Sequence, residues 1–313
     1  MEYKFNYQIG GIEMKIKKVV AILIGVTLIA FGVGLLSLKH YAHKAGISNS
    51  KNSILNLVID NIIESAHNSD YVEKNIDEEI IKNIAGIDTV DIEVPFSNIN
   101  IIPESRDNVK IHYKGYVKAN FIPQLKTRTS NDTLYIYLEQ EAGKPYNTKR
   151  VDLKLNIYIP KDYKKNMKIY TSFGHINVSD LNISQLKLDS SYGHIEIKNL
   201  RGDVEANTSY GDIIAKNYSG NITAITCFGD IILEYMDFDN NIIATTSFGN
   251  IKLILPKNSQ FIIDAHCSLG DIDVDFPVTI SKNEKNRIAG RVGNSRNNIK
   301  LEADSGDIKI ISK

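Results

Sequence analysis

Hydrophobic and polar residues change their spacing three times along the chain, and each change predicts a different structure. Residues 19–38 form an apolar run without a charged side chain. At ~1.5 Å per residue this run spans a ~30 Å hydrocarbon layer, so it is predicted to be a transmembrane helix. Lys15, Lys17 and Lys18 precede it, which places residues 1–18 in the cytoplasm. We therefore expect a single-pass protein of the cell membrane whose remaining chain lies outside. A cleaved signal peptide would have a shorter apolar run and an A-x-A-like site.

Residues 39–85 are predicted to form a helical stalk. Apolar residues recur there at helical spacing. They are Ile54, Leu55, Val58, Ile59, Ile62 and Ile63, followed by a weaker set at Val72, Ile76, Ile80 and Ile81. The polar side of this pattern lacks the Lys and Arg typical of a helix lying on a membrane, so packing against the following domain is favoured.

From residue 86 the period becomes two, which predicts half-buried β-strands. Residues 86–166 contain four alternating runs separated by prolines, and we expect an irregular β entry region. From residue 167 a glycine returns at intervals of 19, 18, 18, 20, 21 and 36 residues. These glycines are Gly174, Gly193, Gly211, Gly229, Gly249, Gly270 and Gly306. A period near 20 is typical of a solenoid, and the last interval indicates an insertion at residues 275–298.

The residue two places after each glycine is always isoleucine. The column contains Ile176, Ile195, Ile213, Ile231, Ile251, Ile272 and Ile308. The positions seven and five before each glycine are also apolar, so each coil should have two short strands with inward side chains and a hinge at the glycine. Glycine suits such a hinge because it tolerates positive φ. The pattern predicts an all-β fold, a parallel β-solenoid of coils of about 20 residues over 167–313.

The repeated unit (S/T)-(F/Y)-G-(D/H/N)-I-x-(V/I/L) resembles a bacterial family of β-strand-repeat domains called putative adhesins. It starts at Ser172, Ser191, Ser209, Ser247 and Ser268, with SGDIKI at Ser305. The segment VDIEVPFSNINIIPES is similar to that family's degenerate first repeat, with Ser97 in the place of glycine. The resemblance covers residues 86–313 and implies the fold. It implies a cell-envelope location, and it leaves the function undefined.

His175 and His194 occupy one column of the repeat, directly after the glycine, and Asp or Asn fills the rest. Two imidazoles on adjacent coils could share a metal ion. The alternative is that Asp, Asn and His suit an exposed turn, and this reading is favoured because no third ligand has metal spacing. We therefore expect no metal and no cofactor.

The column before the glycine is aromatic, and it is either a binding strip or a corner packed inward. It contains Phe173, Tyr192, Tyr210, Phe228 and Phe248, and ends at Leu269. The register favours inward packing. The same register puts Cys227 outward and Cys267 inward two coils away, beyond the ~7 Å Cα separation of a disulfide, so none is expected.

The insertion is rich in positive charge. Its basic residues, with one just after it, are Lys282, Lys285, Arg287, Arg291, Arg296 and Lys300. A basic hairpin can bind anionic cell-wall polymers or lipid headgroups, but a solvated hairpin is the favoured interpretation. Lys plus Arg and Asp plus Glu are both 37. This balance gives no overall attraction to nucleic acid.

No phosphate-binding loop, nucleophile elbow or H-E-x-x-H motif occurs in the sequence. The favoured function is a non-enzymatic surface scaffold that binds an envelope component or an envelope protein. The alternatives are an accessory in envelope-stress signalling and a glycan-acting enzyme. The enzyme would need converging carboxylates, for which Asp264, Glu302 and Asp304 are candidates by count alone.

Overall fold

The computed structural model describes residues 6–9, 12–15, 71–139, 148–284 and 286–313. The chain divides into two units, Met1–Asp70 and Tyr71–Lys313. In the first unit β1 (Asn6–Ile9) pairs with β2 (Ile12–Lys15) in antiparallel fashion. The predicted transmembrane segment 19–38 and the stalk up to residue 70 lie outside the described residues. Within the described ranges, no helix is long and apolar enough to cross a membrane.

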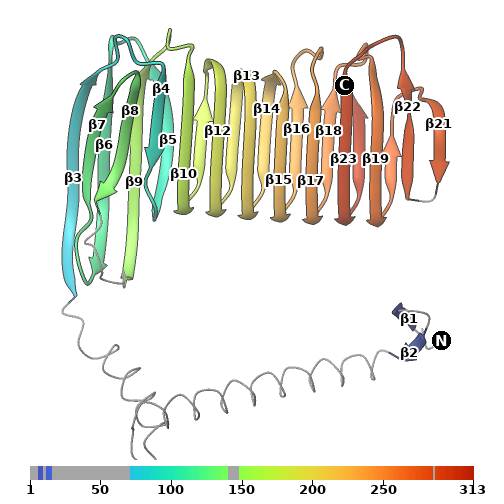
Figure 1. Cartoon of the computed structure of the whole chain (residues 1–313), viewed down its shortest axis with the longest axis horizontal. Helices are drawn as coiled ribbons and strands as arrows, with labels where there is room; N and C mark the ends of the chain where they lie inside the picture. Colours follow the sequence, from blue (N-terminus) through green and yellow to red (C-terminus); the bar gives the residue numbers. More distant parts are fainter. Residues whose placement is uncertain (1–5, 10–11, 16–70, 140–147, 285) are drawn as a thin grey trace, which may run out of the picture. The chain divides into compact units, whose positions relative to one another are not determined.

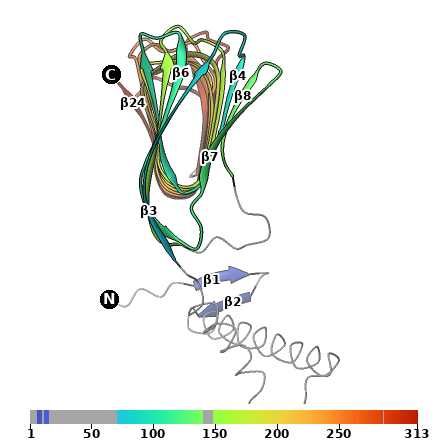
Figure 2. The same ribbon diagram turned by 90° about the vertical axis from the view of Figure 1, so that its left-hand side faces the viewer.

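The second unit is a flattened β-solenoid in which 22 strands belong to one hydrogen-bonded sheet. Seen from its end, the sheet wraps into a narrow tube with two long faces, which we call sheet A and sheet B (Figure 2). Each coil consists of a strand of sheet A, a corner and the next strand of sheet B. The successive coils lie side by side along the body (Figure 1).

Sheet A contains, in spatial order, β7 (Gln124–Ser130), β8 (Thr133–Glu139), β4 (Thr89–Glu93), β10 (Asn166–Phe173), β12 (Asn182–Tyr192), the second half of β13 (Ile195–Tyr210), β15 (Ile222–Phe228), β17 (Ile242–Phe248), β23 (Asn298–Ser305), β19 (Phe261–Leu269), β22 (Arg287–Val292) and β21 (Thr279–Glu284). Sheet B contains β3 (Val72–Asn83), β6 (Asn108–Ala119), β9 (Thr148–Pro160), β5 (Ser97–Glu104), β11 (Ile176–Ser179), the first half of β13, β14 (Ile213–Ser219), β16 (Ile231–Tyr235), β18 (Ile251–Leu255), β24 (Ile308–Ser312) and β20 (Ile272–Val274).

The side chains that alternate inward form one continuous core between the two sheets. The isoleucine column is buried from Ile176 to Ile251 and at Ile308, while Ile272 in the short edge strand β20 is partly buried. The residues five positions before the glycine are also buried, and in the middle coils they are the small residues Ala206, Ala224 and Ala244. The predicted all-β architecture of the repeat region is therefore confirmed.

The glycine column is required by close approach between coils, and the predicted hinge explanation is incomplete. A Cβ built on Gly229 would lie 2.1 Å from the carbonyl oxygen of Gly211, and one on Gly249 would lie 2.0 Å from that of Gly229. A real Cβ cannot come so near to a backbone oxygen. Each corner therefore rests directly on the corner of the coil before it, and a side chain would separate the two.

The coils do not stack in chain order at the C-terminal end. β23 pairs with β17 on one side and with β19 on the other, and β24 lies between β18 and β20. The coil of Gly306 therefore lies inside the stack, and the coil of Gly270 lies outside it. The predicted insertion 275–298 supplies the hairpin β21–β22, which pairs antiparallel with β19.

Antiparallel strands extend both sheets at the N-terminal end of the solenoid and sheet A at its C-terminal end. β6 and β3 continue sheet B beyond β9, and β7 continues sheet A beyond β8. The helix predicted through Val72 and Ile80 is wrong, because residues 72–83 form strand β3. Val72, Ile76 and Ile80 are four residues apart, a spacing that also falls on one face of a strand. Ile81, the member that breaks this parity, is exposed.

Candidate functional site

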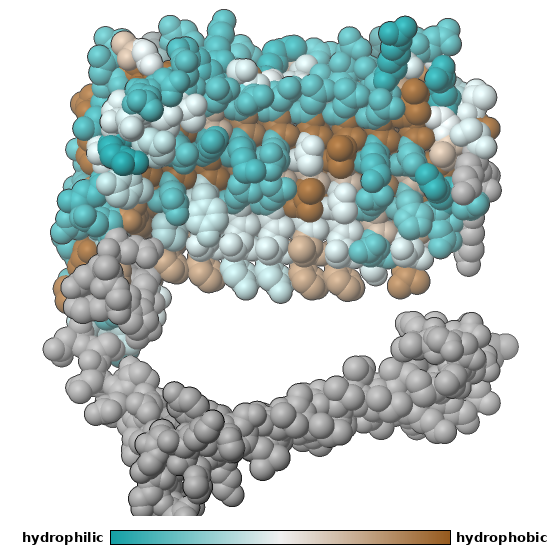
Figure 3. All heavy atoms as spheres, in the orientation of Figure 1, coloured by the Kyte–Doolittle hydropathy of each residue, from teal (hydrophilic) through white to brown (hydrophobic). Residues whose placement is uncertain are grey.

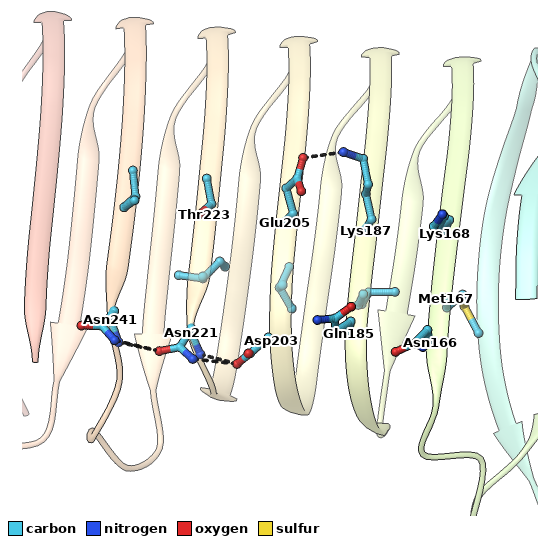
Figure 4. A pocket seen from close by; sticks show the side chains of 14 residues that line it. Asn166, Met167, Lys168, Gln185, Lys187, Asp203, Glu205, Asn221, Thr223 and Asn241 are labelled. Atoms are coloured by element: carbon cyan, nitrogen blue, oxygen red, sulfur yellow. Dashed lines mark hydrogen bonds and ion pairs between the residues drawn. The ribbon is translucent and has the colours of Figure 1, made fainter. Parts of the chain in front are cut away.

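The outer face of sheet A carries a shallow open groove that crosses five coils near the starts of their strands (Figure 4). The groove has a volume of about 370 Å³. Its lining residues are Asn166, Met167, Lys168, Gln185, Leu186, Lys187, Asp203, Val204, Glu205, Asn221, Ile222, Thr223, Asn241 and Ile243. Parallel pairing puts equivalent residues of successive coils next to one another. One column of the groove carries an amide or a carboxylate in every coil, whereas the other changes from lysine to glutamate, threonine and isoleucine.

Amide and carboxylate side chains along one edge of the groove hold each other in place. The Asn221 side-chain amide donates to Asp203 Oδ1 at 2.9 Å, and the Asn241 backbone N–H donates to Asn221 Oδ1 at 2.9 Å. Lys187 Nζ donates to Glu205 Oε1 at 2.5 Å. This bond raises the pKa of Lys187 and lowers the pKa of Glu205. These exposed groups remain charged at neutral pH and present fixed polar atoms to a ligand.

His175 and His194 stack with ring centroids 5.0 Å apart and serve as caps for the corners. His175 Nδ1 accepts a hydrogen bond from the His194 backbone N–H at 3.0 Å, and His194 Nδ1 accepts one from the Asp212 backbone N–H at 2.9 Å. Asp212 Oδ1 accepts from the Asp230 N–H in the same way. The column thus has one structural role along the stack, as turn chemistry predicts. Within the described residues, no group of three or more His, Cys, Asp or Glu side chains could hold a metal.

The corner at His175 should make stability depend on pH. Burial, together with the charge of His194, lowers the pKa of His175. The unfolded chain then binds a proton at a higher pH than the folded chain, so the free energy of unfolding falls as pH drops below about 6.5. The fall ends below the lowered pKa of the folded state. Urea unfolding of the full chain between pH 8 and pH 5 measures this effect.

The substitution His175→Asn is the control for this pH dependence. Asn250 in the same column accepts a backbone N–H through Oδ1, so an asparagine keeps the cap and removes the titration. We expect the variant to lose part of the decline in stability between pH 7 and pH 5. An unchanged decline would assign it to other groups.

The aromatic column is exposed, and the predicted inward packing is wrong. Phe173, Tyr192, Tyr210, Phe228 and Phe248 are 45–55% exposed. Successive rings lie 4.9–5.0 Å apart and within 4° of parallel. The column lies at the corner, where strict alternation ends, and the inward place belongs instead to the residue two positions earlier.

That inward column consists of small hydroxyl residues, and the sequence analysis did not identify it. It contains Thr171, Ser190, Thr208, Thr226 and Thr246, followed by Cys267 and Ala303. Thr226 Oγ1 donates to the Gly211 carbonyl at 2.9 Å, and Thr246 Oγ1 donates to that of Gly229 at 3.0 Å. Five Ser or Thr residues three places before glycine were the available signal. A buried hydroxyl at an inward position needs such an acceptor.

Two of the six basic residues named for the insertion are paired with carboxylates in the described structure. Arg287 donates to both carboxylate oxygens of Asp264, at 2.8 and 2.6 Å, and lowers the pKa of that carboxyl. Lys300 lies in β23 and pairs with Glu302 at 3.0 Å. Arg291 and Arg296 are exposed, in β22 and in the following turn. The side chain of Lys282 and the whole of Lys285 lie outside the described structure.

The two cysteines face as the register predicts. Cys227 is exposed and Cys267 is buried. The inserted coil of β23 places them three coils apart instead of two. Burial raises the pKa of the Cys267 thiol, which donates to the Gly270 carbonyl at 3.2 Å.

A parallel β-solenoid with a glycine corner in every regular coil and antiparallel strands at both ends defines the class of this protein. The chain belongs to the Toastrack DUF4097 family, whose model matches residues 87–219 and 203–311. This match confirms the resemblance seen in the repeated unit. The comparison with curated proteins found no match.

Solved structures from several bacteria have a similar fold. A putative cell adhesion protein from Clostridium sporogenes is 18% identical, with 77% of this chain and 100% of that chain covered and a TM-score of 0.36. A putative adhesin from Bacteroides fragilis is 15% identical, covers 77% and 97%, and has a TM-score of 0.43. A putative lipid binding protein from Parabacteroides distasonis is 14% identical, covers 79% and 98%, and has a TM-score of 0.31.

Proposed function

We propose that the protein is a non-enzymatic binding module of the cell envelope. Its β-solenoid is held outside the membrane by residues 19–38, and the groove of sheet A binds a cell-wall polymer. The observation that carries this proposal is the groove itself, in which one column presents an amide or a carboxylate side chain in every coil. A ligand that also repeats along its length can make the same contact several times, so weak contacts add up along the stack.

The lining residues favour a hydroxyl-bearing polymer. Gln185, Asn221 and Thr223 offer donors and acceptors for hydroxyl groups. Lys168 and Lys187 stand on adjacent coils, and Asp203 and Glu205 balance their charge in the same groove, with Lys187 held by Glu205. The groove is open, as expected for a site that a long chain enters from the side.

The candidate acids give no support for a glycan-cleaving enzyme. The carboxylate of Asp264 is held by Arg287, and the Glu302 carboxylate is paired with Lys300. A glycosidase needs two carboxyl groups on either side of the scissile bond, one of them with a raised pKa. The lowered pKa of Asp264 is the opposite of what a general acid requires.

Retention of the purified full chain on cell-wall sacculi, in a mild detergent, tests the proposal. The double substitution Lys168→Ser with Gln185→Ala alters the groove, and we expect at least a fivefold lower bound fraction. The control is Lys252→Ser with Lys309→Ser on the outer face of sheet B, which removes more charge and should leave binding unchanged. A chain that is not retained, or two double variants that lose binding equally, would contradict the proposal.

A further inference from the structure

The exposed aromatic column forms an apolar ridge along one corner of the solenoid. The rings from Phe173 to Phe248 are about half exposed, a partly buried sixth ring, Phe96, stacks on Phe173, and Leu269, two coils beyond Phe248, is 66% exposed. The row is visible along the lower edge of the body as pale and brown atoms (Figure 3). At roughly 100 Å² per half-exposed ring the ridge presents about 500 Å² of aromatic surface. A monomer seldom exposes a larger apolar patch unless a partner covers it.

The stacking of the rings restricts what can bind to the ridge. Each ring covers the face of its neighbour, with centroids 4.9 Å apart from Phe173 to Phe228. Sugars and nucleic acid bases bind aromatic side chains through ring faces, which are taken up within the stack. The ridge offers ring edges at a fixed interval. A surface that fits it needs apolar groups at the same interval, and an identical ridge has them.

The column beside the ridge is asymmetric along the stack. In spatial order it reads Asn98, His175, His194, Asp212, Asp230, Asn250, Asp307 and Asp271. Both histidines lie in one half, and three of the four aspartates lie in the other. A twofold axis perpendicular to the stack, between two facing ridges, reverses the order of this column and keeps it on the same side. The histidine half of one copy then faces the acidic half of the other.

At the N-terminal end, parts of β9, β6 and β3 project past the first corner, and this overhang limits where a second copy can bind. Ser97 at the first corner pairs with Leu153, so residues 148–152 of β9 continue past the corner with β6 and β3. β3 and β9 extend below the lower edge of the body in Figure 1. A second copy avoids this overhang when the axis passes between Tyr210 and Phe228, the centre of the eight corners.

We propose that a second copy of this chain packs on the ridge in antiparallel orientation, with Tyr210 facing Phe228 and Tyr192 facing Phe248 of the other copy. In this register His175 faces Asp307, and His194 faces Asn250. The like-charged contacts, in which Asp212 of each copy faces Asp230 of the other, lie at the centre. There each carboxylate already accepts a backbone N–H, at 2.8 and 2.7 Å. The contact is independent of the proposed polymer binding, because the groove lies at the opposite ends of the same strands.

Sedimentation equilibrium of the full chain in density-matched detergent tests the proposal. We expect a dimer at micromolar concentration. The double substitution Tyr192→Ser with Phe248→Ser removes two facing pairs and should weaken association at least a hundredfold. The control Ile225→Ser with Ile243→Ser removes apolar side chains of similar exposure from the face of sheet A, 40% and 43% exposed, and should remain dimeric. A monomeric full chain, or equal association of the two double variants, would overturn the proposal.

An exchange of His175 and Asp307 tests the antiparallel orientation without touching the ridge. His175→Asp places an acid opposite Asp307 and should weaken the dimer about tenfold. His175 Nδ1 accepts a backbone N–H, so its neutral ring carries the proton on Nε2 and can donate to a carboxylate. The second substitution Asp307→His again places such a donor opposite an acid, and the dimer should recover to within about twofold. Both residues keep the corner cap, since Asp and His each perform it elsewhere in the column. Failure of the second substitution to restore association would overturn the antiparallel arrangement.

Discussion

Replacing Gly229 with alanine will lower the free energy of unfolding by about 3 kcal/mol or more. The new methyl group would lie 2.1 Å from the carbonyl oxygen of Gly211, and backbone must move to make room. The Gly229 N–H donates to Phe248 O at 2.9 Å, and the Gly229 carbonyl accepts from Thr246 Oγ1 at 3.0 Å. Any shift that relieves the clash therefore weakens the bonds to the next coil. Urea unfolding followed by circular dichroism measures the change.

Gly86 supplies the control for this prediction. It has φ of +78° and nothing within 4 Å of an added Cβ, so alanine there meets only the strain of the left-handed backbone. We expect Gly86→Ala to cost about 1 kcal/mol. If Gly229→Ala cost no more than Gly86→Ala, contact between the corners would not be the reason for the glycine column.

The periodic residues predicted the coil correctly because a solenoid repeats one local environment. Ile213 and Ile231 occupy equivalent inward positions, so each repeat is independent evidence for the same placement. The repeat period could not reveal why glycine is needed at the corner. The need for glycine depends on the carbonyl of the previous corner, which is a contact between coils and leaves no separate mark on the spacing.

The corner itself is where prediction from alternation fails. Thr226 and Phe228 are two residues apart and share one parity, yet Thr226 is buried and Phe228 is exposed. The backbone begins to turn as it approaches Gly229, so alternation along the strand no longer determines whether a side chain points inward or outward. The same uncertainty led to the wrong placement of the aromatic column, whereas the histidine column followed from its Asp and Asn neighbours.

The groove of sheet A was not predicted because no single repeat contains it. Lys187 and Glu205 are 18 residues apart and belong to different coils. Their pairing requires the lateral register of β12 and β13, which becomes definite only when the coils are stacked. Sites on repeat proteins commonly extend over several repeats in this manner.

The order of the last coils is another feature that periodicity leaves open. The inward residues Ile299 and Leu301 of β23 are equivalent to Ile263 and Ala265 of β19. Either strand could therefore follow β17 with the same columns aligned. The hairpin β21–β22 occupies the outer edge of β19, and the chain then returns to the inner side.

Removing residues 298–313 should consequently disrupt the stack well before its end. β23 and β24 are paired on both sides, so their loss leaves β17 and β18 unpaired on one side and separates β19 and β20 from the body. We expect the amides of all four strands to lose at least about a hundredfold of their hydrogen-exchange protection. Amides of β10 and β12, several coils away, should keep theirs, because coils interact mainly with their nearest neighbours.

Hydrogen exchange of the full chain and of the truncated chain ending at Asn297 decides between two orders of assembly. If the coils could stack in chain order, β19 would close onto β17 after truncation, and its amides would stay protected. Ala265 would then meet Ala244 where Leu301 now fills the space between them. Two facing alanines bury less apolar surface than an alanine and a leucine, so this closure lacks the packing that stabilises the intact stack. If β19 keeps its protection after truncation, the fold does not require the last coil to lie between β17 and β19.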